Sequence, residues 1–262
     1  MPATFPSHAA AVLPCKLAWP RRFDGVALVV GSAAPDLYYP LSGHVDVPAT
    51  HNLPGLFWFS LPVTLVATVL IRRSAPVVAA HLPARPDWLA LPDYGVLGRV
   101  RHRWYVTVYS ALLGATTHLI WDGFTHYEES AQGWGVRLVP VLATEAWPGV
   151  PWWLFAQHAS TVLGAVAAFA VAVHIGRRRL LRRWHGPPPA VARTPRVFWA
   201  VAVTVAAGYP LTWPLLRFPY AAHVQGVRMI WAFALAAIAA ATAAAVAAGL
   251  ARRRAVGARH GG

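Results

Sequence analysis

Long apolar segments alternate with shorter polar ones along most of the chain. Each long segment has about 20 residues, which is the helix length needed to cross the roughly 30 Å hydrocarbon layer of a membrane. Two shorter segments, His8–Trp19 and Phe23–Ala34, are expected to form half-depth or interfacial helices. The pattern predicts an all-α polytopic membrane helical bundle with about five transmembrane helices. The expected spans are Leu53–Ile71, Trp104–Trp121, Leu154–Ile175, Val197–Leu216 and Met229–Leu250.

Composition agrees with a membrane protein. Of the 262 residues, 57% are hydrophobic and only 12% are charged, and the mean hydropathy is +0.45, which lies outside the range of ordinary soluble domains. We therefore expect a single integral-membrane domain over 1–262. Within it we distinguish a core at 1–175, a basic cytoplasmic linker at 176–196, and a C-terminal helical pair with a basic tail at 197–262. The Pro-rich stretch at 74–98 is expected to be a cytoplasmic excursion.

Basic residues are gathered beside the apolar segments. A net charge of +14 would favour nucleic acid in a soluble protein, but no basic groove with interleaved aromatic residues accompanies it, so we expect no nucleic-acid partner. Traced through the five spans, the clusters fall on one side, as the positive-inside rule requires. This pattern indicates a multi-pass membrane protein whose basic side is cytoplasmic. The clusters are Arg21–Arg22, Arg72–Arg73, Arg99–Arg103, Arg177–Arg183 and Arg252–Arg254.

The segment GATTHLIWDGFTH places three metal-ligand residue types four positions apart inside an apolar run. Ionisable residues within a membrane are rare and usually functional. On a helix, His118 and Asp122 project from one side about 6 Å apart, and His126 follows if the helix persists. Three such side chains are too spread to hold one ion on an ideal helix. Either the helix end, near Gly123 and Thr125, bends inward, or two metals share the row.

Four more residues of these types come from separate segments that the trace places at the same, non-cytoplasmic end. Mixed nitrogen and oxygen ligands suit zinc, with manganese or iron as alternatives. His44, Asp46 and His223 are weaker reserves. The single Cys15 excludes an internal disulfide. The candidate metal ligands are His8, Asp36, His51, His118, Asp122, His126 and His158.

Each candidate also has a simpler interpretation. A lone histidine at a helix end is commonly a hydrogen-bonded surface group, and His118 with Asp122 can form a structural pair in lipid. The chain contains no HExxH, GxSxG, Walker or GxGxxG motif, so the familiar hydrolase and nucleotide-binding signatures are missing. A metal-bound water is then the most economical attacking group. Asp36 or Asp122, whichever is not a ligand, is the expected general base.

Five motifs together resemble one known family, and their order and spacing match from Met1 to about Ile175. They are TFPSHAAAVLP, GSAAPDLYY, HNLPGLF, GATTHLIWDGFTH and QHASTVLG. The chain resembles domain-of-unknown-function family 4184, bacterial membrane proteins. That family's pattern is in turn similar to inner-membrane metal-dependent hydrolases, and more distantly to all-helical zinc phospholipases. The hydrolase resemblance corresponds to His8, Asp36, His51, His118 and Asp122, whereas His126 and His158 belong to the nearer family pattern.

The leading hypothesis is a membrane-embedded metal-dependent hydrolase. It would act on an ester or phosphoester of a membrane lipid or lipid-linked molecule, through metal-activated water at the non-cytoplasmic side. One alternative is a transporter that moves protons or a metal through the same residues. Another is a non-catalytic membrane protein with a structural metal. The sequence specifies no oligomeric state.

Overall fold

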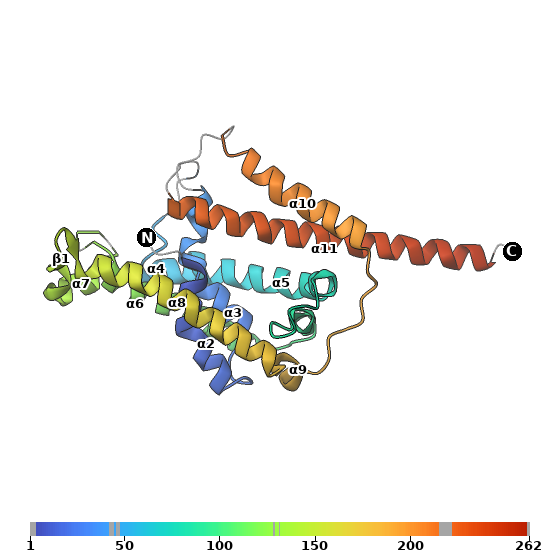
Figure 1. Cartoon of the computed structure of the whole chain (residues 1–262), viewed down its shortest axis with the longest axis horizontal. Coiled ribbons are helices and arrows are strands. Elements are labelled where there is room, and N and C mark those ends of the chain that lie inside the picture. The colour runs from blue at the N-terminus through green and yellow to red at the C-terminus, as the bar shows by residue number, and fades with distance from the viewer. Residues whose placement is uncertain are drawn as a thin grey trace. The chain divides into compact units, whose positions relative to one another are not determined.

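The computed structural model shows an almost entirely helical chain (Figure 1). It describes residues 4–41, 45, 48–127, 129–130, 132–214 and 222–260, so the reserve residues His44 and Asp46 lie outside it. The prediction of an all-α fold is confirmed, with a single pair of two- to three-residue strands among the described residues. The chain divides into two compact units. The first comprises Met1–Thr68, His102–Ala172 and Pro219–Val227, and the second Val69–Arg101, Val173–Phe218 and Arg228–Gly262.

The first unit contains the N-terminal helices, the helix that carries His118 and the segment that follows that helix. Helices α5, α8 and α11 begin in it and continue into the second unit. The expected half-depth segments become short helices, here α2 and α3. Its elements are α1 (Thr4–Ser7), α2 (Ala9–Ala18), α3 (Gly25–Gly31), η1 (Ala34–Leu41), α4 (Leu53–Gly55), η2 (Leu56–Ser60), α5 (Leu61–His81), α6 (Trp104–Thr125), α7 (Trp134–Leu138), η4 (Pro140–Ala143), β1 (Glu145–Trp147), β2 (Val150–Pro151), α8 (Trp152–Arg177) and the first turn of α11 (Ala222–His260).

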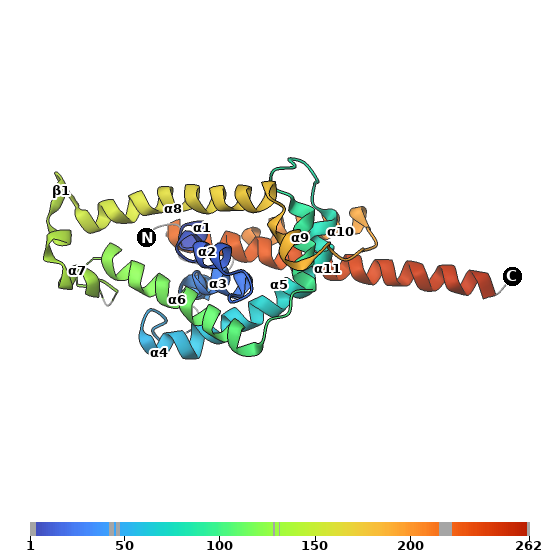
Figure 2. The ribbon, with the colours of Figure 1, turned by 90° about the horizontal axis from the view of Figure 1, so that it is seen from below.

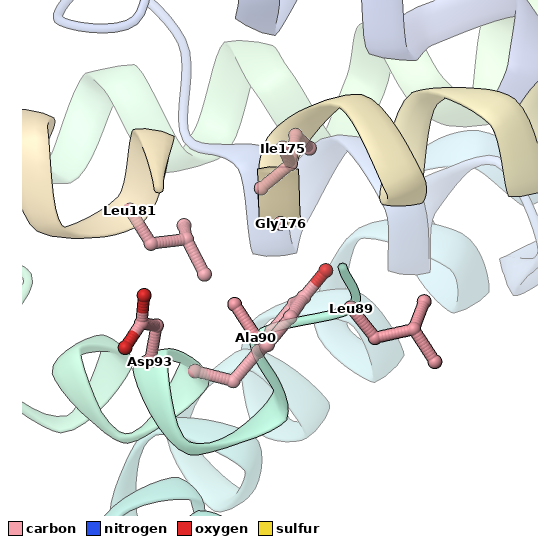
Figure 3. Close-up of a pocket in the computed structure, with 7 residues that line it drawn as sticks. Leu89, Ala90, Asp93, Ile175, Gly176 and Leu181 are labelled. Atoms are coloured by element: carbon pink, nitrogen blue, oxygen red, sulfur yellow. The ribbon is translucent and has the colours of Figure 1, made fainter. Parts of the chain in front are cut away.

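The second unit adds three elements to the continuing helices. In its core, Phe198 packs with Ala240 and Ala244. Asp93 is 1% exposed and receives Arg179 Nη1 at 3.1 Å and Arg182 Nε at 2.6 Å. Figure 3 shows its carboxylate pointing toward the segment that carries Leu181. These two ion pairs join the first of the three new elements to the second. The three elements are η3 (Leu91–Gly98), α9 (Leu180–His185) and α10 (Pro195–Leu211).

Two helices are longer than the hydropathy pattern predicts. We expected the chain to leave α5 near Ile71, but the helix continues to His81 and includes Pro76. Tertiary packing explains the continuation, because Val77 and Val78 lie against the Phe198 cluster. Helix α11 likewise extends past its apolar part into the basic tail. The predicted ends of these two spans, Ile71 and Leu250, therefore come before the observed ends of the helices.

Three helical stretches are long and apolar enough to cross a membrane, by length and composition, among the residues the structure describes. This agrees with a membrane protein, but the expected count of five spans is not supported. Helix α10 has only 17 residues, and α6, although it has 22, is not among the three. The three stretches are Leu53–His81, Trp152–Arg177 and Val224–Arg253.

Helix α3 lies closely against α6 (Figure 2). A Cβ atom on Gly114 would lie 2.4 Å from Leu28 O, and one on Gly31 would lie 2.4 Å from Ala111 O. Small residues are what allow two helix backbones to approach this closely. Asp24 also ties the start of α3 to α6, because it caps Val26 N and accepts Thr107 Oγ1 at 2.8 Å. The crossing is thus fixed by backbone contact and by a buried cap.

We expect Gly114→Ala to lower the free energy of unfolding by about 1–3 kcal/mol, the usual penalty for overpacking a close contact. The added methyl group would push α3 away from α6. The measurement is thermal unfolding of the purified protein in detergent. Gly208→Ala is the matched control, because nothing lies within 4 Å of its Cβ position and alanine favours a helix interior. Equal melting of the two variants would show that the crossing tolerates a side chain.

Candidate metal centre

Four buried side chains converge in the first unit from three separate segments. Asp36 comes from η1, His51 precedes α4, and His118 and Asp122 lie one turn apart on α6. One ligand atom from each lies within 4.8 Å of every other. The predicted convergence of distant imidazoles and carboxylates is therefore present for these four residues.

The spacing of these atoms is close to that of a coordination shell. His51 Nε2 lies 2.8 Å from Asp36 Oδ1 and 3.8 Å from Asp122 Oδ2. His118 Nε2 lies 3.2 Å from Asp122 Oδ2 and 3.5 Å from Asp36 Oδ1. Ligand atoms around a tetrahedral zinc with bonds of about 2.1 Å lie about 3.4 Å apart. Two imidazoles and two carboxylates at these distances can hold a divalent metal ion.

His118 is oriented by a backbone carbonyl. Its side chain is fully buried, and Nδ1 lies 2.8 Å from Ser32 O. A carbonyl can only accept, so Nδ1 carries the proton and Nε2 points toward the two carboxylates. Although Nε2 is close to both, it has no partner with hydrogen-bond geometry in the described part of the chain. Metal-binding histidines commonly use this arrangement, in which the other ring nitrogen donates to the protein.

His51 is oriented by a hydroxyl group. Thr50 Oγ1 donates its only hydrogen to Pro35 O at 3.0 Å. It must then accept from His51 Nδ1, which lies 3.0 Å away. The remaining Nε2 of a neutral imidazole presents a lone pair to Asp36 Oδ1. Since two acceptors repel each other, this contact requires either a proton or a cation.

The charge on Asp36 is set by its neighbours. Burial by itself raises the pKa of this carboxyl, but the imidazoles of His118 and His51 favour the carboxylate and hold the pKa well below its usual range. Asp36 is therefore ionised. An ionised carboxylate this far from water needs compensating positive charge, which a metal ion supplies.

His8 lies at the edge of this group. Its ring stacks on that of His118 with centroids 4.1 Å apart, and its Nε2 lies 3.7 Å from Asp122 Oδ1. Burial, aided by His118, lowers the pKa of His8 to about 4. Its imidazole is neutral near pH 7 and offers a lone pair. His8 is the residue that precedes α2, and its side chain makes no cap on that helix.

His126 also lies beside Asp122, because α6 ends there as predicted. The helix stops at Thr125, and His126 has extended backbone angles. Its Nδ1 donates to Asp122 O at 3.0 Å and lies 3.9 Å from Asp122 Oδ1. Its Nε2 is buried, with no hydrogen-bond partner within the described ranges.

His158 is placed differently. It lies on α8 with an exposed side chain and is not part of the four-residue group. The side chain of the reserve residue His223 is outside the described residues.

Two orienting residues were missed by sequence reasoning. Ser32 contributes a backbone carbonyl, for which no residue type is a signal. Thr50 stands directly before His51, and that adjacency was the only available indication. The structure therefore adds supporting contacts to candidate ligands that the sequence predicted.

Comparison with known proteins gives one match. A family model described as Domain of unknown function (DUF4184) matches residues 1–251. Neither the curated proteins nor the solved structures contain a match to the chain.

Removing a ligand should remove metal. We expect purified His118→Ala and Asp122→Ala proteins to carry much less zinc or manganese than the parent, as measured by elemental analysis. His158→Ala is the matched control, since an exposed histidine should leave the content unchanged. Parent-like metal content in both ligand variants would refute the centre.

Thr50→Val should weaken metal binding without removing a ligand. Valine keeps the shape but cannot accept from His51 Nδ1, and loss of such an orienting partner typically lowers metal affinity about 10–100-fold. Competition with a chelator measures the affinity. Thr161→Val removes a hydroxyl that bonds to Gln157 O on α8 and should leave the affinity unchanged. If Thr50→Val binds as tightly as the parent, the hydroxyl does not orient His51.

Proposed function

We propose that this chain, which belongs to the DUF4184 family, is a membrane-embedded metal-dependent hydrolase that acts on an ester or phosphoester of a lipid or lipid-linked molecule. The proposal is supported chiefly by one observation, the convergence of four buried ligand groups from three segments. In two of these segments the Nδ1 atom of a histidine contacts the protein, His118 at Ser32 O and His51 at Thr50 Oγ1. The Nε2 atom of each imidazole is left facing the centre. Such a preorganised polar site is a functional feature rather than a packing one.

Zinc is the divalent ion that we propose for the centre. When bound, zinc lowers the pKa of a coordinated water and polarises the oxygen of a bound ester or phosphoester. His51 and His118 would hold the ion together with one of the two carboxylates. The other carboxylate, Asp36 or Asp122, would accept a proton from the attacking water, because both are buried beside the same imidazole. Their burial also excludes bulk water from the reacting groups.

The position of the centre along α6 favours the non-cytoplasmic surface of the inner membrane. Arg103, in a basic cluster, immediately precedes α6, and Asp122 lies near its other end. Nineteen residues of helix cover roughly 28 Å, close to the thickness of the hydrocarbon layer. With the basic cluster at the cytoplasmic boundary, the centre would be near the opposite headgroups.

The segment after α6 supports a lipid substrate. In the same unit as the centre, Leu138, Val141 and Trp147 are 71%, 59% and 72% exposed. Large apolar side chains at such exposure fit an interface with lipid, where tryptophan is enriched. A substrate that is itself part of the bilayer would reach the centre without leaving the membrane.

One observation favours a transporter as a second candidate. Ser60, Thr64 and Thr68 form a row at four-residue spacing, and their hydroxyls are buried without hydrogen-bond partners among the residues described here. Hydroxyls in membrane helices usually bond to a carbonyl one turn back, so this row could serve a path for protons or ions along η2 and α5. It stands second because the row carries no ionisable group.

Zinc-loaded protein in vesicles should release product from a lipid ester or phosphoester, as detected by mass spectrometry of the lipid extract. We expect Asp36→Asn to reduce turnover about 10²–10⁴-fold, the usual loss when a positioned base is removed, while His158→Ala turns over like the parent. Zinc or proton flux that depends on His118, with no product formed, would support the transporter. If folding depends on the metal but neither flux nor product is seen, the result would support the third hypothesis, a non-catalytic membrane protein with a structural metal.

A further inference from the structure

The basic residues of the chain are concentrated in the second unit. It carries 18 of the 23 lysine and arginine residues, five in Val69–Arg101, eight in Val173–Phe218 and five in Arg228–Gly262. Of the nine acidic residues, only Asp87 and Asp93 fall in this unit. The second unit therefore has a large surplus of positive charge, whereas the charges of the first unit nearly cancel.

Six of these arginines lie at η3 and at the turn between α8 and α9, and each has an exposed side chain. Helix α8 ends at Arg177 and α9 begins at Leu180. Element η3 packs against α9, and Nη1 of Arg99, which follows η3, lies 3.4 Å from Pro187 O, just beyond α9. We call the exposed face that these six residues form the η3–α9 surface. They are Arg99, Arg177, Arg178, Arg179, Arg182 and Arg183.

The buried carboxylate of Asp93 holds two of the six arginines in place. Arg179 Nη1 lies 3.1 Å and Arg182 Nε lies 2.6 Å from its two oxygens, while the two arginine side chains remain 45% and 48% exposed. A guanidinium has five N–H donors, and each of these bonds takes only one of them. Even together with Asp87, this carboxylate cannot balance six guanidinium groups. The η3–α9 surface therefore stays strongly positive and presents donors at fixed positions.

The η3–α9 surface adjoins the end of a helix of membrane-spanning length. The apolar stretch Trp152–Arg177 ends at one of the six arginines. Trp88, which is 37% exposed, lies against the same helix end, because a Cβ atom on Gly176 would collide with its carbonyl oxygen. Tryptophan and arginine side chains together are typical of the boundary between headgroups and hydrocarbon. The anions nearest to a surface at this boundary are lipid phosphates, whereas a nucleic acid has to reach it from solution.

We propose that the η3–α9 surface binds the phosphate headgroups of anionic phospholipids in the adjoining leaflet of the membrane. A guanidinium can bond to two phosphate oxygens at once, and each basic residue near an anionic membrane surface strengthens binding about fivefold. Bound lipid holds η3 and α9 at the headgroup layer. The interaction is independent of the metal centre, so it stands whether or not the protein is a hydrolase.

Lipid binding by the purified full chain in detergent, measured by native mass spectrometry, tests this surface. The probes are dioleoyl phosphatidylglycerol and dioleoyl phosphatidylcholine, which share their acyl chains and differ in headgroup charge. We expect the parent to bind phosphatidylglycerol at least about tenfold more tightly. The variant Arg178→Gln/Arg183→Gln should lose most of this preference, because it lacks two contributions of about fivefold each. If the double variant does not fold, Arg178→Gln alone should bind phosphatidylglycerol about fivefold more weakly.

A second double variant provides the matched control. Arg252→Gln/Arg253→Gln removes the same charge from α11, where both side chains are also exposed, and it should keep the preference of the parent. Equal binding of the two lipids by the parent overturns the proposal. So does an equal loss of preference in the two double variants, since overall charge and not this surface would then attract the lipid. Tighter binding of a single-stranded DNA oligonucleotide than of phosphatidylglycerol by the parent would also overturn it and assign the surface to nucleic acid.

Discussion

Two carboxylates buried around one imidazole nitrogen are the constraint on which the rest of the structure depends. Asp36 Oδ1 and Asp122 Oδ2 lie 3.5 and 3.2 Å from the same His118 Nε2. Burying an ionised carboxylate costs several kcal/mol even after relaxation, and two close together also repel each other. A single proton on Nε2 can be donated well to only one of them. A divalent cation can bind both at once, so the arrangement fits a metal better than it fits a protonated histidine.

The fold keeps these groups in place by contacts that do not depend on an ion. The close approach of α3 and α6 brings Ser32 O to His118 Nδ1. Thr50 links His51 to the carbonyl of Pro35, the residue before Asp36. Two of the segments that carry candidate ligands are thus joined to each other, and the third, α6, is joined to the end of α3. Orienting partners of this kind fix which imidazole nitrogen is available, so these contacts position the four-residue group without an ion.

The sequence predicted the convergence of four candidate ligands better than it predicted the limits of the helices. Four-residue spacing places His118 and Asp122 on one side of a helix whatever its exact limits, and the charge clusters placed Asp36 and His51 at the same end. His158 shows where this reasoning fails. Helix α8 is apolar on nearly every side, so periodicity gives no direction for one polar residue. The extents of α5 and α11 were also missed, because they depend on tertiary packing and on a basic helical tail.

Helix α6 shows why apolarity alone is a poor guide to a helix that carries a polar site. Its buried face includes Thr107, Ser110, His118 and Asp122, whereas Trp104, Ile120 and Trp121 are exposed. This is the reverse of a soluble helix, whose apolar residues face the core. The polar face lowers the average hydropathy of α6, although its exposed side suits lipid and its 22 residues exceed the roughly 20 needed to cross a bilayer. Composition, and not length, therefore separates α6 from the three longer apolar stretches.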